Sequence, residues 1–191
     1  MSKARILGTA VTISQRFVAQ ALGEGDIAVD ATAGNGNDTL FLARTVGPQG
    51  QVYAFDIQED ALDKTRRRLA EAGELLQTRL IKDGHENLAQ YVQGPVAAIM
   101  FNLGYLPRGN HEIITRPETT CRAIEAGLEL LGPRGIMSIV VYSGHPGGDR
   151  EAAEVESMVQ KLDQTRFSVL RMDFVNRKHN SPYLILVEKE N

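Results

Sequence analysis

The segment from Asp26 to Ala43 constrains the fold more than any other part of the sequence. A short apolar run, Ile27-Ala28-Val29, ends in the acidic Asp30, and a turn with the closely spaced glycines Gly34 and Gly36 follows. An apolar pattern typical of a helix begins directly after this turn. A strand, a tight loop and a helix in this order let the backbone pass close to a nucleotide-like ligand. The sequence therefore predicts an α/β fold with a ligand site after its first strand.

A second acidic residue supports this interpretation. Residues 51–56 are typical of the next strand and end in Asp56, about 20 residues beyond the glycine turn. An acid at the end of the second strand is placed to accept hydrogen bonds from a ribose diol. The alternative is an ordinary strand–helix turn in which Asp38 caps the helix.

The turn itself excludes two common nucleotide sites. A dinucleotide site requires a third glycine in G-x-G-x-x-G, and Thr39 stands in its place. A P-loop requires Gly-Lys-Ser/Thr, which does not follow. The residues instead resemble motif I of class I S-adenosylmethionine-dependent methyltransferases, D-x-G-x-G-x-G, with Thr32 in place of the first glycine. The resemblance implies that Asp30 faces the methionine end of the cofactor and Asp56 its ribose.

The rest of the chain alternates between strand and helix patterns. Strands are expected at 78–82, 96–101 and 136–142, helices at 13–22, 59–72, 86–92, 117–131 and 149–164, and two final strands at 167–174 and 183–187. Alternating βα units followed by a strand–turn–strand end predict a doubly wound sheet with an antiparallel C-terminal hairpin. We expect one domain, residues 1–191.

Polar and aromatic side chains follow two of these strands. Asn102 and Tyr105 begin a loop that resembles the N-P-P-Y loop of amino-directed methyltransferases, shortened and with glycine in place of one proline. Asn102 offers an amide oxygen to an amine hydrogen, and Tyr105 offers a ring on which a base stacks. After the fifth strand, Tyr142 is a second candidate for stacking and His145 is a candidate base. The alternatives are a packed Tyr105 and a merely exposed His145.

The third predicted strand ends in Asp83, where an acid often approaches the adenine amino group in this class of fold. The alternative is that Asp83 caps the following helix, and one residue can do both. The predicted cofactor-binding residues are thus Asp30, Thr32, Gly34, Asn35, Gly36, Asn37, Asp38, Thr39, Asp56, Gln58, Asp83, His85 and Asn102.

Composition limits the other function classes. The net charge of −3 provides no global basic field for nucleic acid, so an RNA contact requires a local patch. Arg66-Arg67-Arg68 and the 177–180 turn are candidates, although the arginine run is also typical of a solvated helix face. The single Cys121 excludes an internal disulfide and favours the cytoplasm. We expect no metal site, since no Cys/His cluster is present, and no membrane span or signal peptide.

Further segments resemble the small bacterial rRNA-methylase family over nearly the whole chain. They are residues 30–43, 55–58, 102–107, 119–120, 142–148 and 180–183. The resemblance implies a seven-stranded Rossmann-like methyltransferase that forms a homodimer and uses S-adenosylmethionine. It also implies methyl transfer to the amine of 5-aminomethyl-(2-thio)uridine at wobble position 34, in the anticodon arm of tRNA.

In that reaction Asn102 is expected to orient the amine, Tyr105 or Tyr142 to stack the base, and His145 to accept a proton. Three alternatives stay open. They are a methyltransferase of rRNA or of a small amine, a non-catalytic protein that binds S-adenosylmethionine, and an NAD oxidoreductase. The missing third glycine argues against the last of these.

Overall fold

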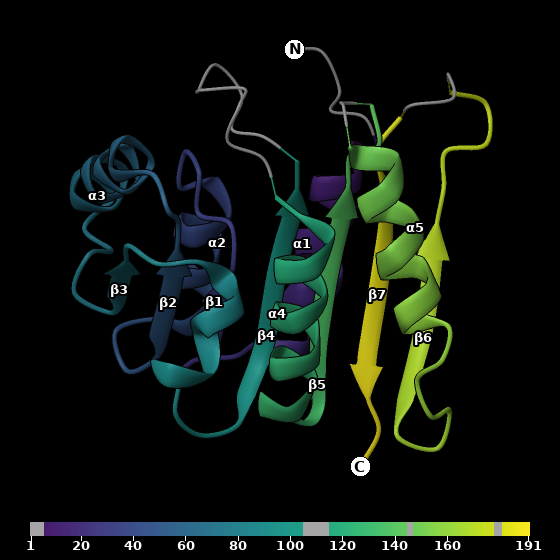
Figure 1. Ribbon diagram of the computed structural model, residues 1–191. Coiled ribbons are helices and arrows are strands. Elements are labelled where there is room, and N and C mark those ends of the chain that lie inside the picture. Colours follow the sequence, from purple (N-terminus) through teal and green to yellow (C-terminus); the bar gives the residue numbers. More distant parts are fainter. Residues whose placement is uncertain (1–5, 105–114, 145–146, 178–180) are drawn as a thin grey trace.

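Seven strands form one sheet. Their bounds are β1 Ile27–Asp30, β2 Gln51–Phe55, β3 Thr78–Ile81, β4 Val96–Leu103, β5 Leu131–Val141, β6 Phe167–Met172 and β7 Tyr183–Lys189. They lie in the order β3-β2-β1-β4-β5-β7-β6 in the computed structural model, which describes residues 6–104, 115–144, 147–177 and 181–191. Neighbours among β1 to β5 are parallel, and β7 is antiparallel to β5 and β6 (Figure 1). The predicted Rossmann-like, doubly wound sheet with its antiparallel hairpin is confirmed.

Helices cover both faces of this sheet. Their bounds are α1 Ala10–Ala21, α2 Asn37–Val46, α3 Glu59–Ala72, the 3₁₀-helix η1 His85–Gln90, α4 Pro117–Leu130 and α5 Gly148–Val159. In Figure 1, α4 and α5 lie in front of the sheet and α1 lies behind it. Because β4 is covered on both sides, it is apolar along most of its length, as buried parallel strands are.

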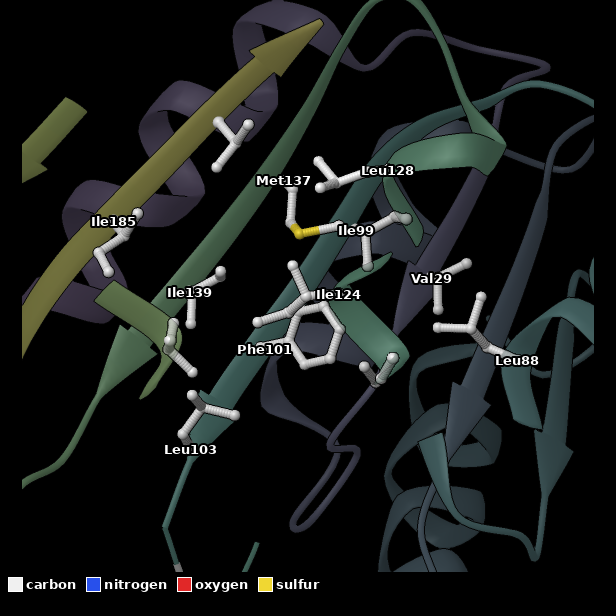
Figure 2. Packing of buried hydrophobic residues seen from close by; sticks show 14 of the residues in the cluster. Val29, Leu88, Ile99, Phe101, Leu103, Ile124, Leu128, Met137, Ile139 and Ile185 are labelled. Atoms are coloured by element: carbon white, nitrogen blue, oxygen red, sulfur yellow. The ribbon is translucent and has the colours of Figure 1, made fainter. Parts of the chain in front are cut away.

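Two hydrophobic cores result from this arrangement. On the face of α4, Ile124 and Leu128 pack on Ile99, Phe101 and Met137 of the central strands (Figure 2). On the opposite face, buried residues of α1, α2 and α3 pack against the other sides of the same strands. The carboxyl ends of β1, β2 and β4 are thereby held at one edge of the sheet, where the predicted site residues lie.

The spacing of apolar residues predicts which side of a helix is buried. On α3 this spacing predicts Ala61, Leu62, Thr65 and Leu69, and these are the buried residues. On α5 it predicts that Ala153 faces inward, but Ala153 is exposed, and the buried residues of this helix include Glu151. An apolar pattern misses a buried carboxylate, since charged side chains normally mark the solvent face.

Two helix starts differ from the capping that the sequence predicts. Thr115 and Glu118 have the spacing of a capping box. In the structure, however, Arg116 is the N-cap residue of α4 and makes no side-chain cap, and the Thr115 hydroxyl donates to Glu151 at 2.6 Å. The segment expected as a helix at 86–92 is the shorter η1, and its cap is Gly84 rather than Asp83. No helix within the described ranges is long and apolar enough to cross a membrane.

Candidate active site

The turn after β1 is shaped by two glycines with left-handed backbone conformations. Gly34 has a φ of 53° and Gly36 a φ of 73°, which glycine adopts at little cost. A Cβ added to Gly36 would lie 2.9 Å from the Cα of Thr65 on α3, so this glycine also permits close packing of the turn on α3. The Thr65 hydroxyl donates to the carbonyl of Gly34 at 3.2 Å. Gly36, and not Asp38, is the N-cap residue of α2.

Asp30 lies beneath this turn and is fully buried. Its carboxylate accepts hydrogen bonds from the Thr39 hydroxyl at 2.6 Å and from the Thr32 N–H at 3.1 Å. Burial, with a further contribution from the charge of Asp38, raises the pKa of Asp30 to about 7. Asp30 and the equally buried Thr39 thus support the turn from below, and their direct contact with a cofactor stays a prediction.

Asp56 connects the loops that follow β1 and β2. One carboxylate oxygen accepts from the N–H of Gly34 and the other from the N–H of Gln58, each at 2.9 Å. Burial raises the pKa of Asp56. Because each carboxylate oxygen has two lone pairs, both oxygens retain capacity for a ligand donor. The two hydrogen bonds hold the carboxylate in a fixed orientation. Because Asp56 is only half-buried, a ligand can reach this carboxylate.

Asn102 is tied to the turn in two ways. Its backbone N–H donates to the Thr32 hydroxyl oxygen at 2.8 Å, and its side-chain Nδ2 donates to Asp38 Oδ2 at 2.7 Å. The other Asp38 oxygen, Oδ1, accepts from Nε2 of Gln15 on α1 at 2.6 Å. The Thr32 hydroxyl therefore makes a hydrogen bond that a glycine at this position could not make. Gln15 also belongs to the site, although nothing in the sequence around it predicted this.

The loop after β3 contains two predicted residues with different environments. Asp83 accepts from Tyr91 Oη at 2.7 Å and Asn87 Nδ2 at 2.9 Å, and these bonds hold its pKa below the usual value. His85 is buried, and its Nδ1 lies 3.2 Å from the carbonyl oxygen of Ala31. Burial lowers the pKa of His85, which favours the neutral ring. The neutral ring donates a hydrogen bond to this carbonyl and helps to hold the turn in place.

The remaining predicted residues lie at the rim of the site. Asn35 is half-buried, and the exposed Asn37 accepts a hydrogen bond from Arg68 of α3. The N–H of Tyr142 donates to the Leu103 carbonyl at 3.3 Å, beside the end of β4. Burial and the charge of Asp38 raise the pKa of Tyr142. Tyr105 and His145 lie outside the described residues, as do residues 178–180 of the second basic candidate.

Among the described residues, no group of three or more His, Cys, Asp or Glu side chains is arranged to hold a metal ion.

The strand order and the glycine turn after β1 define a class I methyltransferase fold. Solved methyltransferases share this fold even at low sequence identity, for example an O-methyltransferase from Thermotoga maritima with 19% identity and a TM-score of 0.65, where the match covers 100% of this chain and 69% of that one. The chain belongs to the family described as "Putative rRNA methylase", whose sequence model matches residues 52–188.

Three relatives are similar over most of the chain. A crystal structure of an rRNA-methylase family protein from Clostridium thermocellum has 42% identity and a TM-score of 0.93, covering 99% of this chain and 100% of that one. A Streptococcus mutans methyltransferase, solved in complex with SAH, has 41% identity and a TM-score of 0.87, covering 99% of each chain.

The third relative is the chloroplastic tRNA (mnm(5)s(2)U34)-methyltransferase of Arabidopsis thaliana. It is 37% identical over 182 residues, which are 90% of this chain. The match spans 66% of the length of that plant protein.

Proposed function

We propose that this protein is an S-adenosylmethionine-dependent N-methyltransferase that acts on the amine of 5-aminomethyl-(2-thio)uridine at tRNA position 34. The observation that carries the proposal is the orientation of Asn102, whose amide nitrogen is bound to Asp38. Its amide oxygen is thereby turned away from Asp38 and suits an amine hydrogen. The plant relative's name gives the nucleoside, and the relative solved with SAH supports the cofactor.

The residues present fit S-adenosylmethionine. Asp56 keeps free lone pairs on a carboxylate fixed by two backbone N–H groups, which suits the two hydroxyls of a ribose. The charges of Asp38 and Asp56 both act on Asp30 and contribute to raising its pKa. A negative potential of this kind suits a sulfonium cation. When bound, the cofactor supplies an electrophilic methyl carbon. Asp83 is half-exposed and is the proposed partner of the adenine amino group.

The chain's own contribution to the chemistry is positioning and desolvation of the acceptor amine. An alkylammonium has no lone pair for attack, so the site must favour the neutral amine by desolvation or by accepting its proton. Asn102 would hold one amine hydrogen, and alignment of the reacting atoms would supply much of the acceleration. Tyr142 is the proposed stacking ring, and the roles of Tyr105 and His145 stay predictions.

A local basic surface supports an RNA substrate. Arg68 contacts Asn37 at the edge of the glycine turn, which places Arg68 of α3 at the rim of the site. Arg66 in the same run is paired with Asp63 at 2.6 Å. An anionic stem contacting Arg67 and Arg68 would meet positive charge in spite of the net charge of −3.

The family description favours a second candidate, methylation of rRNA. Nucleoside mass spectrometry separates the two. Purified protein with S-adenosylmethionine is expected to add one methyl to the wobble nucleoside of tRNA carrying 5-aminomethyl-(2-thio)uridine, and none to rRNA. Asn102→Ala should lose turnover by about 100-fold, the range of a positioned catalytic group, while cofactor affinity is retained. Unchanged turnover in this variant would remove Asn102 from the mechanism.

The homodimer and the cytoplasmic location are also part of this proposal. They rest on the family resemblance and on the single, unpaired Cys121. Sedimentation equilibrium on the purified chain tests the dimer directly.

A further inference from the structure

The N-terminal helix α1 contributes a polar side chain to the site. Its residue Gln15 points Nε2 at Asp38 Oδ1, at 2.6 Å. The neighbouring Ser14 donates its hydroxyl to Ser138 of β5 at 2.7 Å, and both serines are fully buried. This buried contact anchors α1 on the central sheet one residue away from Gln15, so the position of Gln15 is fixed by the fold.

Asp38 is bound by two amides at once. Gln15 donates to one carboxylate oxygen and Asn102 donates to the other, so both amide nitrogens face Asp38. A carboxylate only accepts hydrogen bonds, and this determines which end of each amide faces it. Within the described residues, the Asn102 oxygen Oδ1 has no donor, which leaves it available to a ligand.

We infer that Gln15 is a positioning residue, which through Asp38 keeps the Asn102 amide oxygen directed at the acceptor amine. This inference rests on the proposed function.

Electrostatics explains why Asp38 requires both donors. Asp38 is buried, and its charge acts on two neighbouring titratable groups, Asp30 and Tyr142, whose pKa values it raises. Each amide donates to one oxygen of this buried carboxylate, which would otherwise lack a partner among the described residues. Without Gln15, the oxygen Oδ1 of Asp38 is buried without the hydrogen-bond donor that Gln15 provides.

Gln15 acts through the position of the Asp38 carboxylate. Without the Gln15 donor, Asn102 is the one side-chain amide of the described residues that holds Asp38, and the carboxylate is free to turn. The Asn102 amide then loses its fixed partner, and its oxygen is no longer held toward the acceptor amine. Gln15 itself does not touch the substrate.

A double-mutant cycle tests the inference. Gln15→Leu keeps the size of the side chain and removes the donor, and we expect kcat to fall by about 10-fold with little change in the dissociation constant of S-adenosylmethionine. In the Asn102→Ala background the same substitution should lower kcat by less than about 2-fold, because the residue through which it acts is gone. Gln20→Leu is the matched control, since Gln20 lies exposed on the same helix and donates to the Arg16 carbonyl.

Equal losses from Gln15→Leu with and without Asn102, or no loss in either background, would overturn the inference. A direct readout does not depend on the substrate. In ¹⁵N-labelled protein the side-chain amide resonances of Asn102 should shift in Gln15→Leu and stay in place in Gln20→Leu. Unmoved resonances in both variants also overturn it. A wild-type protein that binds S-adenosylmethionine and methylates no tRNA contradicts the proposed function instead, and the resonance test still decides the role of Gln15.

Discussion

Thr39, in the first turn of α2, donates its hydroxyl hydrogen to Asp30 at the end of β1 across 2.6 Å. Both residues are fully buried. The bond joins strand and helix beneath the glycine turn, so the turn is held between two elements that pack in the core. Because Asp30 has no exposed surface, its carboxyl group affects both stability and the charge of the site.

Stability should therefore depend on pH through Asp30. The folded carboxyl keeps its proton up to a pKa of about 7, whereas the unfolded one releases it near 3.8. Between these values the unfolded state binds fewer protons, so the free energy of unfolding falls as pH rises. We expect wild type to lose roughly 2 kcal/mol relative to Asp30→Asn between pH 5 and pH 8, measured by urea denaturation.

The comparison with Asp30→Asn cancels the other buried groups. Burial raises the pKa of Asp56, which acts in the same direction as Asp30, and lowers the pKa of His85, which costs stability as pH falls below its ordinary value of 6.5. Both groups are present in both proteins. A difference that stays constant with pH would show that Asp30 is ionised throughout the range.

Gly36→Ala should destabilise the protein more than Gly73→Ala. The two glycines have nearly equal φ values, 73° and 75°. Alanine costs about 1 kcal/mol at either position because of the left-handed backbone. At Gly36 the new Cβ would also meet the Thr65 backbone at 2.9 Å, whereas at Gly73 nothing lies within 4 Å. We expect an additional loss of about 1–3 kcal/mol for Gly36→Ala, by thermal or chemical denaturation. Equal losses would mean that α3 moves away without cost.

Glu151→Ala should be far more damaging than Glu154→Ala on the same helix. Glu151 is 2% exposed, and its two oxygens accept from the hydroxyls of Thr115 and Thr120, each at 2.6 Å. Removing the carboxylate leaves these hydroxyls without their acceptor, at a cost of about 1–3 kcal/mol each. Glu154 forms an exposed pair with Arg150 at 3.0 Å, which is worth at most about 1 kcal/mol.

Thr115 extends the effect of Glu151 toward the acceptor side of the site. Its hydroxyl oxygen accepts from the N–H of Gly104 at 2.9 Å, and its N–H donates to the Gly104 carbonyl at 3.0 Å. Gly104 follows Asn102 by two residues, so Glu151→Ala should also lower kcat at temperatures where the variant is folded. Full activity in a folded Glu151→Ala variant would contradict this connection.

Local patterns predicted the elements and which candidate residues lie close together. Asp30 ends β1, and Gly34 and Gly36 lie in the turn that follows it. Asp56 follows β2 and Asn102 lies near the end of β4, so parallel topology alone brings these residues together. Gln15 escaped prediction because its contact with Asp38 depends on how α1 packs on β5, through a hydrogen bond between residues far apart in the sequence. No spacing rule encodes such a contact.

The contacts of Glu151 and of the Thr32 hydroxyl were not predicted, for a different reason. A charge on an amphipathic helix is normally solvated, so nothing in the pattern of α5 distinguished the buried Glu151 from its exposed neighbours. Thr32 was read as a departure from the glycine-rich motif, whereas its hydroxyl is an acceptor for the Asn102 backbone. Both side chains are explained only by partners on other elements.

The position of β7 has a consequence for the order in which the sheet is completed. β6 precedes β7 in the chain, yet its place in the sheet is beyond β7, and β7 is its pairing partner. Residues 167–172 therefore have no place in the sheet, and the edge of β5 stays unpaired, until residues 183–189 have paired with β5. A chain interrupted between these segments would lose two strands, and would present an open edge of its central sheet to other nascent chains.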